Sequence, residues 1–139
     1  MSTGGGVAVS GEKRSLGQFG ERIAAARLEA QGYRIVDRNF RCREGEIDII
    51  AQKGVYLVFV EVRARRGDAM GNAAASLTPL KGARITAAAE AYCQERPDLP
   101  EERRIDVITI DLSPEGRVLR VDHIENAFAG DELPSLPSR

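Results

Sequence analysis

Apolar residues recur along the chain at two spacings, and each spacing predicts a different secondary structure. Over residues 15–31 they return every three or four positions, as on one face of a helix, and Gly32 is a typical stop. A second helix is expected over residues 79–95, because Thr78 is a favourable N-cap and Pro79 suits the first helical position. Both helices are therefore expected to pack through one apolar face.

Shorter apolar runs have the period of two that β-strands show. The expected strands cover residues 33–36, 46–52, 55–62, 105–112 and 118–124. The run 55–62 is almost continuously apolar, which is typical of a central strand covered on both faces. The order α-β-β-β-α-β-β predicts an α/β fold, in which a mixed β-sheet is flanked by a helix on each face.

Length and composition indicate one ordinary globular domain. The chain has 139 residues, of which 42% are hydrophobic and 29% are charged. We expect a flexible leader at 1–14, a single domain at 15–128 and a disordered tail at 129–139. With no run long enough to span a membrane and no signal-peptide core, a cytoplasmic location is expected. Cys42 and Cys93 lack paired-ligand spacing and are interpreted as reduced packing thiols.

Charge is balanced overall but clustered locally. A net charge of −1 counts against polyanion binding over the whole surface, yet permits a local basic patch. Arginine suits two-point contacts with phosphate. The arginines form three groups: Arg38, Arg41 and Arg43; Arg63, Arg65 and Arg66; Arg103 and Arg104. Each group taken alone can also be a set of solvated charges at strand ends.

Acidic residues interrupt the two clearest strands. They occur in the runs Gly-Glu-Ile-Asp-Ile-Ile, residues 45–50, and Val-Phe-Val-Glu-Val-Arg, residues 58–63. A carboxylate in an apolar strand loses hydration, so it needs a cation, a proton or a hydrogen-bond donor. The Lys53-Gly54 turn would bring Asp48 beside Glu61, and proteins hold divalent metals with such adjacent acids.

Alternation assigns these residues to faces and leaves a structural alternative open. Asp48 is expected on the face opposite Ile47, and Glu61 on the same face as Arg63. The alternative is an ion cluster in which the two acids pair with Arg63 and Arg41, because perturbed carboxylates also occur in such networks.

The order of a helix glutamate, a strand aspartate and a Glu-x-Lys element resembles that of the restriction-endonuclease-like nucleases, including the archaeal Holliday junction resolvases. In this chain Glu21, Asp48, Glu61 and Arg63 stand in the four places. The resemblance implies a restriction-endonuclease-like three-layer core and an enzyme that hydrolyses phosphodiester bonds.

A closer resemblance is to the bacterial YraN family, an uncharacterised family predicted to be endonuclease-like. It covers about residues 15–128. The motifs that carry it are Gly-Glu-Ile-Asp-Ile-Ile, Phe-Val-Glu-Val-Arg-Ala-Arg, Arg38-Asn39-Phe40-Arg41, Arg104-Ile105-Asp106-Val107-Ile108 and His123-Ile124-Glu125-Asn126-Ala127-Phe128.

The resemblance implies a metal-dependent endonuclease acting on DNA, including branched or structured forms. Asp48, Glu61 and the Val62 carbonyl would hold Mg²⁺ or Mn²⁺, and Glu21 would complete the shell. Arg63 stands where the nuclease pattern has lysine; it can clamp phosphate but cannot act as a general base. Lys81, early in the second helix, is the nearest substitute lysine, with a solvated first-turn lysine as the alternative.

Nucleic-acid contacts are expected from Arg41, Arg65, Arg66 and Lys81. A second hypothesis is a nucleic-acid-binding module that keeps the fold and the arginines but has lost hydrolysis. A third is that an exposed edge strand forms a protein docking surface or the seam of a homodimer. Asp106 and His123 are interpreted as hydrogen-bonded structural residues.

Overall fold

The computed structural model describes residues 9–67 and 78–128, with side chains described from residue 16 onward. Its elements are α1 (Val9–Ala30), β1 (Arg34–Cys42), β2 (Gly45–Lys53), β3 (Tyr56–Arg66), α2 (Pro79–Gln94), β4 (Glu102–Leu112) and β5 (Val118–Ile124). The five strands form one sheet in the order β1-β2-β3-β4-β5, antiparallel except for the parallel pair β3–β4. The predicted α/β class and element order are confirmed.

The predicted boundaries differ most in three places. Helix α1 begins at Val9, within the expected leader 1–14, and β1 continues to Cys42 rather than ending at Val36. Strand β3 runs through Arg66 rather than ending at residue 62. Residues 68–77 and the expected tail 129–139 lie outside the described residues.

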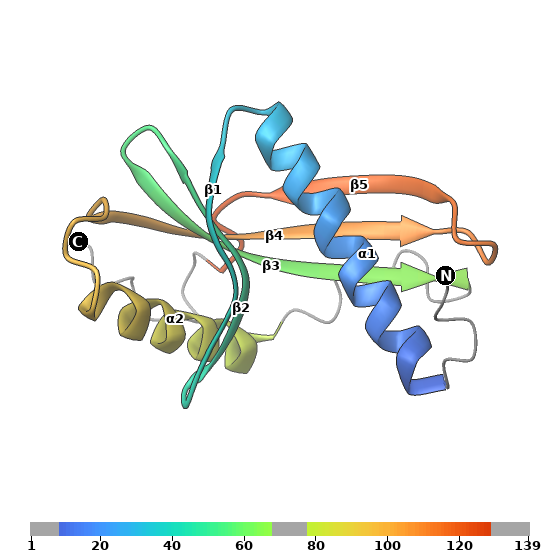
Figure 1. Ribbon diagram of the computed structural model, residues 1–139, viewed down its shortest axis with the longest axis horizontal. Coiled ribbons are helices and arrows are strands. Elements are labelled where there is room, and N and C mark those ends of the chain that lie inside the picture. The colour runs from blue at the N-terminus through green and yellow to red at the C-terminus, as the bar shows by residue number, and fades with distance from the viewer. Residues whose placement is uncertain (1–8, 68–77, 129–139) are drawn as a thin grey trace, which may run out of the picture.

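The sheet separates two apolar layers. Figure 1 shows α1 crossing over β3 and β4. Helix α1 covers one face, against inward side chains such as Val58 and Ile108, whereas α2 covers the other, against Leu57 and Phe59. Because the connection from β3 to the parallel β4 runs through α2, this helix lies on the face opposite α1, as predicted. Among the described helices, none is long and apolar enough to cross a membrane.

Gly20 lets α1 approach β3 closely. A Cβ atom at Gly20 would lie 3.2 Å from the Cβ of Ala64 and 3.6 Å from a methyl of Val62. Glu21 follows Gly20 directly, so this close crossing brings the helix glutamate near the middle of β3.

The β1–β2 ribbon leaves β3 halfway along. Pairing of β2 with β3 covers only the stretch from Lys53, opposite Tyr56, to Ile49, opposite Val60. Beyond it, β2 pairs with β1 alone, and Figure 1 shows the ribbon turning across β3 toward α2. Asn39, which lies opposite Asp48 in the β1–β2 register, has a φ of 55°. A left-handed residue of this kind bends a strand, and asparagine tolerates it better than most.

Because β2 bends, its side chains do not alternate between the two faces of the sheet as predicted. Ile49 packs on the α1 side, as strict alternation requires, but Ile47 packs on the α2 side instead of sharing the face of Ile49. Asp48 therefore stands at the turning point of the strand rather than on a regular face. It also lies beside the central strand of the sheet, not at an outer edge.

Candidate functional site

Asp48 occupies the gap that opens where β2 and β3 separate. One carboxylate oxygen, Oδ2, accepts a hydrogen bond from the backbone N–H of Val62 at 2.8 Å. Had the ladder continued, that N–H would have faced the backbone of β2. The side chain thus replaces a missing strand partner, and the hydrogen bond holds the carboxylate against the middle of β3.

The Asp48 carboxylate lies in a negative environment. Burial first, and then the nearby Glu61 carboxylate, raises the pKa of Asp48 to about 7; Glu21 and Glu46 contribute in the same direction. The hydrogen bond from Val62 opposes this shift without cancelling it. The structure therefore places both Glu61 and Glu21 close enough to Asp48 to raise its pKa, whereas Glu21 is not among the groups that shift the pKa of Glu61.

Glu61 is paired with a cation from its own strand. Its Oε2 lies 3.1 Å from Nη1 of Arg63, and the two side chains are only 13% and 21% exposed. Burial raises the pKa of Glu61, while Arg63 and Lys81 partly offset the effect. The predicted common face of Glu61 and Arg63 is confirmed, and so is one half of the ion-cluster alternative.

The other half of that alternative is wrong. Arg41 forms an ion pair with Glu46, with 3.2 Å between Nε and Oε1, instead of with Asp48 or Glu61. Both partners are largely exposed, at 77% and 62%, so the pair contributes little to stability. Arg41 therefore pairs with an exposed neighbouring acid and not with the partly buried Asp48 or Glu61.

A pocket of about 210 Å³ opens beside Glu61 on the α2 side of the sheet. Its lining residues are Gly45, Glu46, Glu61, Arg63, Lys81, Arg84 and Ile85. Gly45 closes one wall, because a Cβ there would lie 3.3 Å from the carbonyl oxygen of Arg84. The side chain of Thr78 fixes the first turn of α2 by accepting the N–H of Lys81 at 3.2 Å, which leaves the Lys81 ammonium for the pocket.

Two other predicted residues, Arg65 and Arg66, do not line this pocket and lie on different faces of the sheet. Alternation along β3 places Arg65 on the same face of the sheet as Glu61 and Arg63, two residues beyond Arg63. Arg66 points the other way and comes within reach of Gly116, in the turn between β4 and β5. Arg66 is therefore separated from the pocket by the sheet.

Two charged residues of the pocket, a cation and an acid, were not among the predicted site residues. Arg84 lines the pocket together with Lys81, and the three-residue spacing on one helix was the signal available for it. Glu46, whose side chain is 62% exposed, also lines the pocket.

The donor atoms suit a hard divalent cation. Carboxylate and carbonyl oxygens are the ligands that Mg²⁺ and Mn²⁺ favour, and a cation would relieve the repulsion between Asp48 and Glu61. Within residues 9–67 and 78–128, no three His, Cys, Asp or Glu side chains are grouped closely enough to share one ion. A cation here would thus be held by two carboxylates at most, with the Val62 carbonyl and water as further ligands.

Comparison with known proteins identifies close relatives. The model of a family described as "Uncharacterised protein family UPF0102" matches residues 20–110, a segment that contains every residue of the pocket. A UPF0102 protein of Geobacter sulfurreducens is 48% identical over 120 residues, covering 86% of this chain and 92% of the relative. One from Frankia alni is 44% identical over 116 residues, covering 84% and 96%. One from Anaeromyxobacter dehalogenans is 42% identical over 131 residues, covering 94% and 96%.

Proposed function

Because this chain belongs to the uncharacterised family UPF0102, which is the YraN family that its motifs resemble, we propose a function from the site itself: metal-dependent hydrolysis of phosphodiester bonds in DNA. The observation that carries the proposal is the meeting of Asp48 and Glu61 where β2 leaves β3, close enough for Glu61 to raise the pKa of Asp48. Burying two acids together costs stability, which is understandable if they bind a cation.

Asp48 and Glu61 would hold the cation, together with the carbonyl of Val62. Glu21, brought close by the α1 crossing at Gly20, would add a further oxygen through water. When bound, Mg²⁺ or Mn²⁺ polarises a phosphoryl oxygen and lowers the pKa of water. Val62 would have a double role in this arrangement: its N–H orients Asp48, and its carbonyl, which in a strand points to the same side as its N–H, would bind the cation.

The three cations around the pocket would bind the phosphate backbone. Arg63 stays protonated, so it donates to phosphate and stabilises negative charge that develops on it. Glu61 orients the Arg63 guanidinium through their 3.1 Å ion pair. Lys81 and Arg84 add positive charge from α2, and Lys81 takes the place of the lysine that the nuclease pattern has two residues after the glutamate. Arg41 and Arg65 would extend the contact to neighbouring phosphates.

A nucleic-acid-binding protein without hydrolytic activity is the second candidate. The Arg63–Glu61 ion pair favours it, because an internal cation already neutralises one of the two acids. In that case binding should weaken steeply with salt and be indifferent to Mg²⁺.

We further propose that the protein acts in the cytoplasm and that its partner is DNA rather than RNA.

A cleavage assay separates the two candidates. Linear, flapped and four-way DNA, and the matching RNAs, are incubated with the full chain in Mg²⁺ or Mn²⁺. We expect wild-type protein to cleave at least one DNA and Glu61→Ala to cleave none. Glu115→Ala, which changes an exposed acid in the β4–β5 turn, should match wild type. Equal behaviour of wild type and Glu61→Ala on every substrate would overturn the proposal.

A further inference from the structure

Each acid that lines the pocket beside Glu61 has an arginine next to it. Oε2 of Glu61 lies 3.1 Å from Nη1 of Arg63, and Oε1 of Glu46 lies 3.2 Å from Nε of Arg41. Each pair carries no net charge, so these acids do not on balance repel an anion that enters the pocket. What the pocket binds is therefore decided by its remaining charged groups.

The remaining charged groups are two cations from the first turns of α2, Lys81 and Arg84. They stand three residues apart, so their side chains leave the helix on the same side. Neither forms an ion pair with any side chain of residues 16–67 and 78–128. Lys81 acts on Glu61 at longer range, because its charge opposes the rise in the pKa of that acid. The pocket thus offers two positive charges that no ion pair of the described fold occupies.

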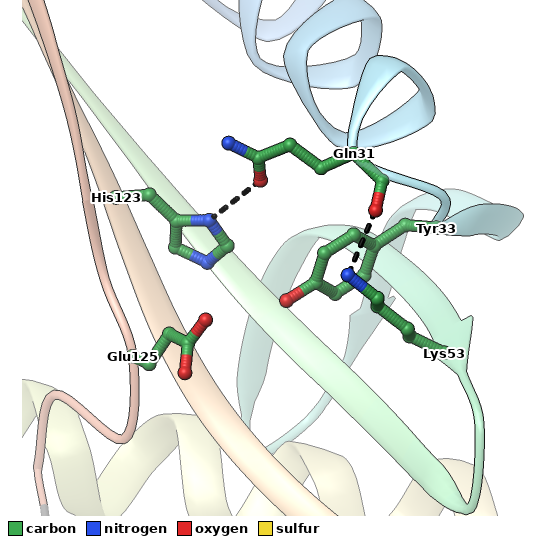
Figure 2. Close-up of a pocket in the computed structure, with 5 residues that line it drawn as sticks. All are labelled: Gln31, Tyr33, Lys53, His123 and Glu125. Carbon is green, nitrogen blue, oxygen red and sulfur yellow. Dashed lines mark hydrogen bonds between the residues drawn. The ribbon is translucent and has the colours of Figure 1, made fainter.

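A larger pocket at the end of α1, shown in Figure 2, gives the contrast. The lysine that lines it, Lys53, is already engaged: its Nζ donates to the backbone oxygen of Gln31 at 2.8 Å and lies 4.8 Å from the centre of the Tyr33 ring. His123 of the same pocket has its Nε2 2.7 Å from Oδ2 of the buried Asp106. These groups hold the fold together, whereas the two cations of α2 are available to a ligand.

The shape of the pocket beside Glu61 suits a small group rather than a continuous chain. Its volume of about 210 Å³ is below the roughly 300–1,000 Å³ usual for small-molecule sites. At one wall the tip of the β1–β2 ribbon touches α2, since a Cβ on Gly45 would lie 3.3 Å from the carbonyl oxygen of Arg84. A strand that entered the pocket could not leave between these two elements, so the end of a strand fits better than its interior.

Charge favours a strand end as well. A phosphate inside a strand carries one negative charge, whereas a terminal phosphate is a monoester with a charge of about −1.5 to −2 at pH 7. The two cations of α2 match the larger charge, and arginine can contact two oxygens of one phosphate. Glu61 belongs both to the pocket and to the proposed cation site. A phosphate bound in the pocket would therefore lie next to the scissile bond.

We propose that this pocket binds the terminal phosphate of a DNA strand, with Arg84 and Lys81 as its main contacts. The phosphate can stand at the 5′ or the 3′ end, since both are phosphomonoesters. This binding site rests on the proposed function, because it names the feature of DNA that the same site recognises. Hydrolysis would then release short products from phosphorylated ends.

Fluorescence anisotropy with oligothymidylates in EDTA, which removes divalent cations, tests the site. Three oligonucleotides with an internal fluorophore are compared: one with a 5′-phosphate, one with a 3′-phosphate, and one with hydroxyl ends. The last is longer by one nucleotide and so has the same number of phosphates. At one fixed, low salt concentration we expect at least one phosphorylated oligonucleotide to bind about tenfold more tightly than the hydroxyl-ended one. The preferred end gives the polarity, and equal binding of all three would overturn the proposal.

Two substitutions in α2 locate the preference. Arg84→Met and Lys81→Met should each lose most of it with Tm unchanged, because Arg84 is exposed and the Thr78 cap uses only the backbone N–H of Lys81. The matched control is Arg117→Met, which changes an exposed arginine between β4 and β5 and should keep the preference. Unchanged preference in both α2 variants would overturn the proposal. An equal loss in Arg117→Met would do the same, because the preference would then reflect only the overall charge of the protein.

Asp48→Asn separates this binding site from the proposed hydrolysis. Asp48 does not line the pocket, so the variant should keep the preference for a terminal phosphate and cleave no DNA in Mn²⁺. If the wild type prefers phosphorylated ends but cleaves nothing, the hydrolysis proposal fails and the binding site stands. If the wild type cleaves DNA without preferring phosphorylated ends, the binding site fails and the hydrolysis proposal stands.

Discussion

The carboxylate of Asp48 accepts the backbone N–H of Val62 at 2.8 Å, across the point where β2 and β3 stop pairing. A strand hydrogen bond is thereby replaced by a bond to a side chain. The arrangement satisfies a donor that would otherwise lack a backbone partner, and it places an acid next to Glu61. The geometry of the site therefore depends on the divergence of the two strands as much as on the residues themselves.

Replacing Asp48 by asparagine should stabilise the metal-free protein at neutral pH. The pKa of Asp48 rises from its ordinary 3.8 to about 7 in the fold, so its stabilising contribution is complete below pH 4 and is lost as pH rises toward 7. Asparagine cannot ionise, yet its oxygen can still accept the N–H of Val62. We expect the free energy of unfolding of Asp48→Asn at pH 8 to exceed that of the wild type by about 1–2 kcal/mol, as measured by urea denaturation in EDTA.

The gain in Asp48→Asn should shrink when the same denaturation is repeated at pH 5. Asp48→Ala is the companion variant; it removes the charge but also leaves the Val62 N–H unsatisfied, which costs about 1–3 kcal/mol if the site stays dry. If Asp48→Asn is less stable than the wild type at both pH values, burial and the neighbouring acids do not disfavour the ionised Asp48 carboxylate.

Divalent cations should stabilise the wild-type protein through Asp48 and Glu61. We expect Mn²⁺ at about one hundred times its dissociation constant to add about 2.7 kcal/mol, seen as a rise in Tm. Glu61→Gln should lose most of that rise, whereas Glu29→Gln, on the exposed side of α1, should keep it. Equal shifts in Tm for wild type and Glu61→Gln would place the cation elsewhere.

Lys81 should matter for nucleic-acid chemistry and not for folding. Its backbone N–H, rather than its ammonium, is bonded to Thr78, so Lys81→Met leaves the helix cap intact. We expect cleavage to fall by roughly 10²-fold in Lys81→Met, the scale of losing one charge-stabilising group, with Tm unchanged. Lys81→Arg should recover part of the rate if the role is charge alone. Cleavage by Lys81→Met at the wild-type rate would remove Lys81 from the site.

Arg63→Lys tests whether the arginine limits activity. The substitution restores the Glu-x-Lys pattern and keeps the ion pair with Glu61 possible. We expect faster cleavage by Arg63→Lys than by wild type, in parallel single-turnover assays with the same DNA. A slower Arg63→Lys would indicate that two-point binding of phosphate by the guanidinium is essential here.

Two glycines of α1 offer a matched test of the helix crossing. Gly17 has no atom within 4 Å of an added Cβ, so Gly17→Ala should stabilise the helix by about 0.5–1 kcal/mol. At Gly20 an added Cβ meets that of Ala64 at 3.2 Å, so Gly20→Val should destabilise the fold by about 1–3 kcal/mol. Urea denaturation measures both, and similar effects of the two substitutions would contradict the close crossing.

Local chemistry made much of the fold predictable. The N-cap at Thr78 and the proline after it correctly located the start of α2, because capping depends on neighbouring residues only. The common face of Glu61 and Arg63 followed from the period of β3, which is regular over its whole length. The start of α1 at Val9 was missed because a run rich in glycine and serine has little helical preference of its own.

The sequence by itself determined the order of the elements, the two faces of the sheet and the identity of the acids, since these depend on residue type and short-range periodicity. Only the tertiary structure decided how the acids meet. Strand β2 leaves β3 after Ile49, next to the left-handed Asn39 of β1; Ile47 packs on the α2 face, and Asp48 accepts the N–H of Val62. Tertiary structure likewise joined Asp106 to His123, from two strands whose partnership no local pattern reveals. The hydrophobic period of a strand indicates which of its own residues share a face. The geometry of a site also depends on where neighbouring strands bend, twist and separate, which no local pattern gives.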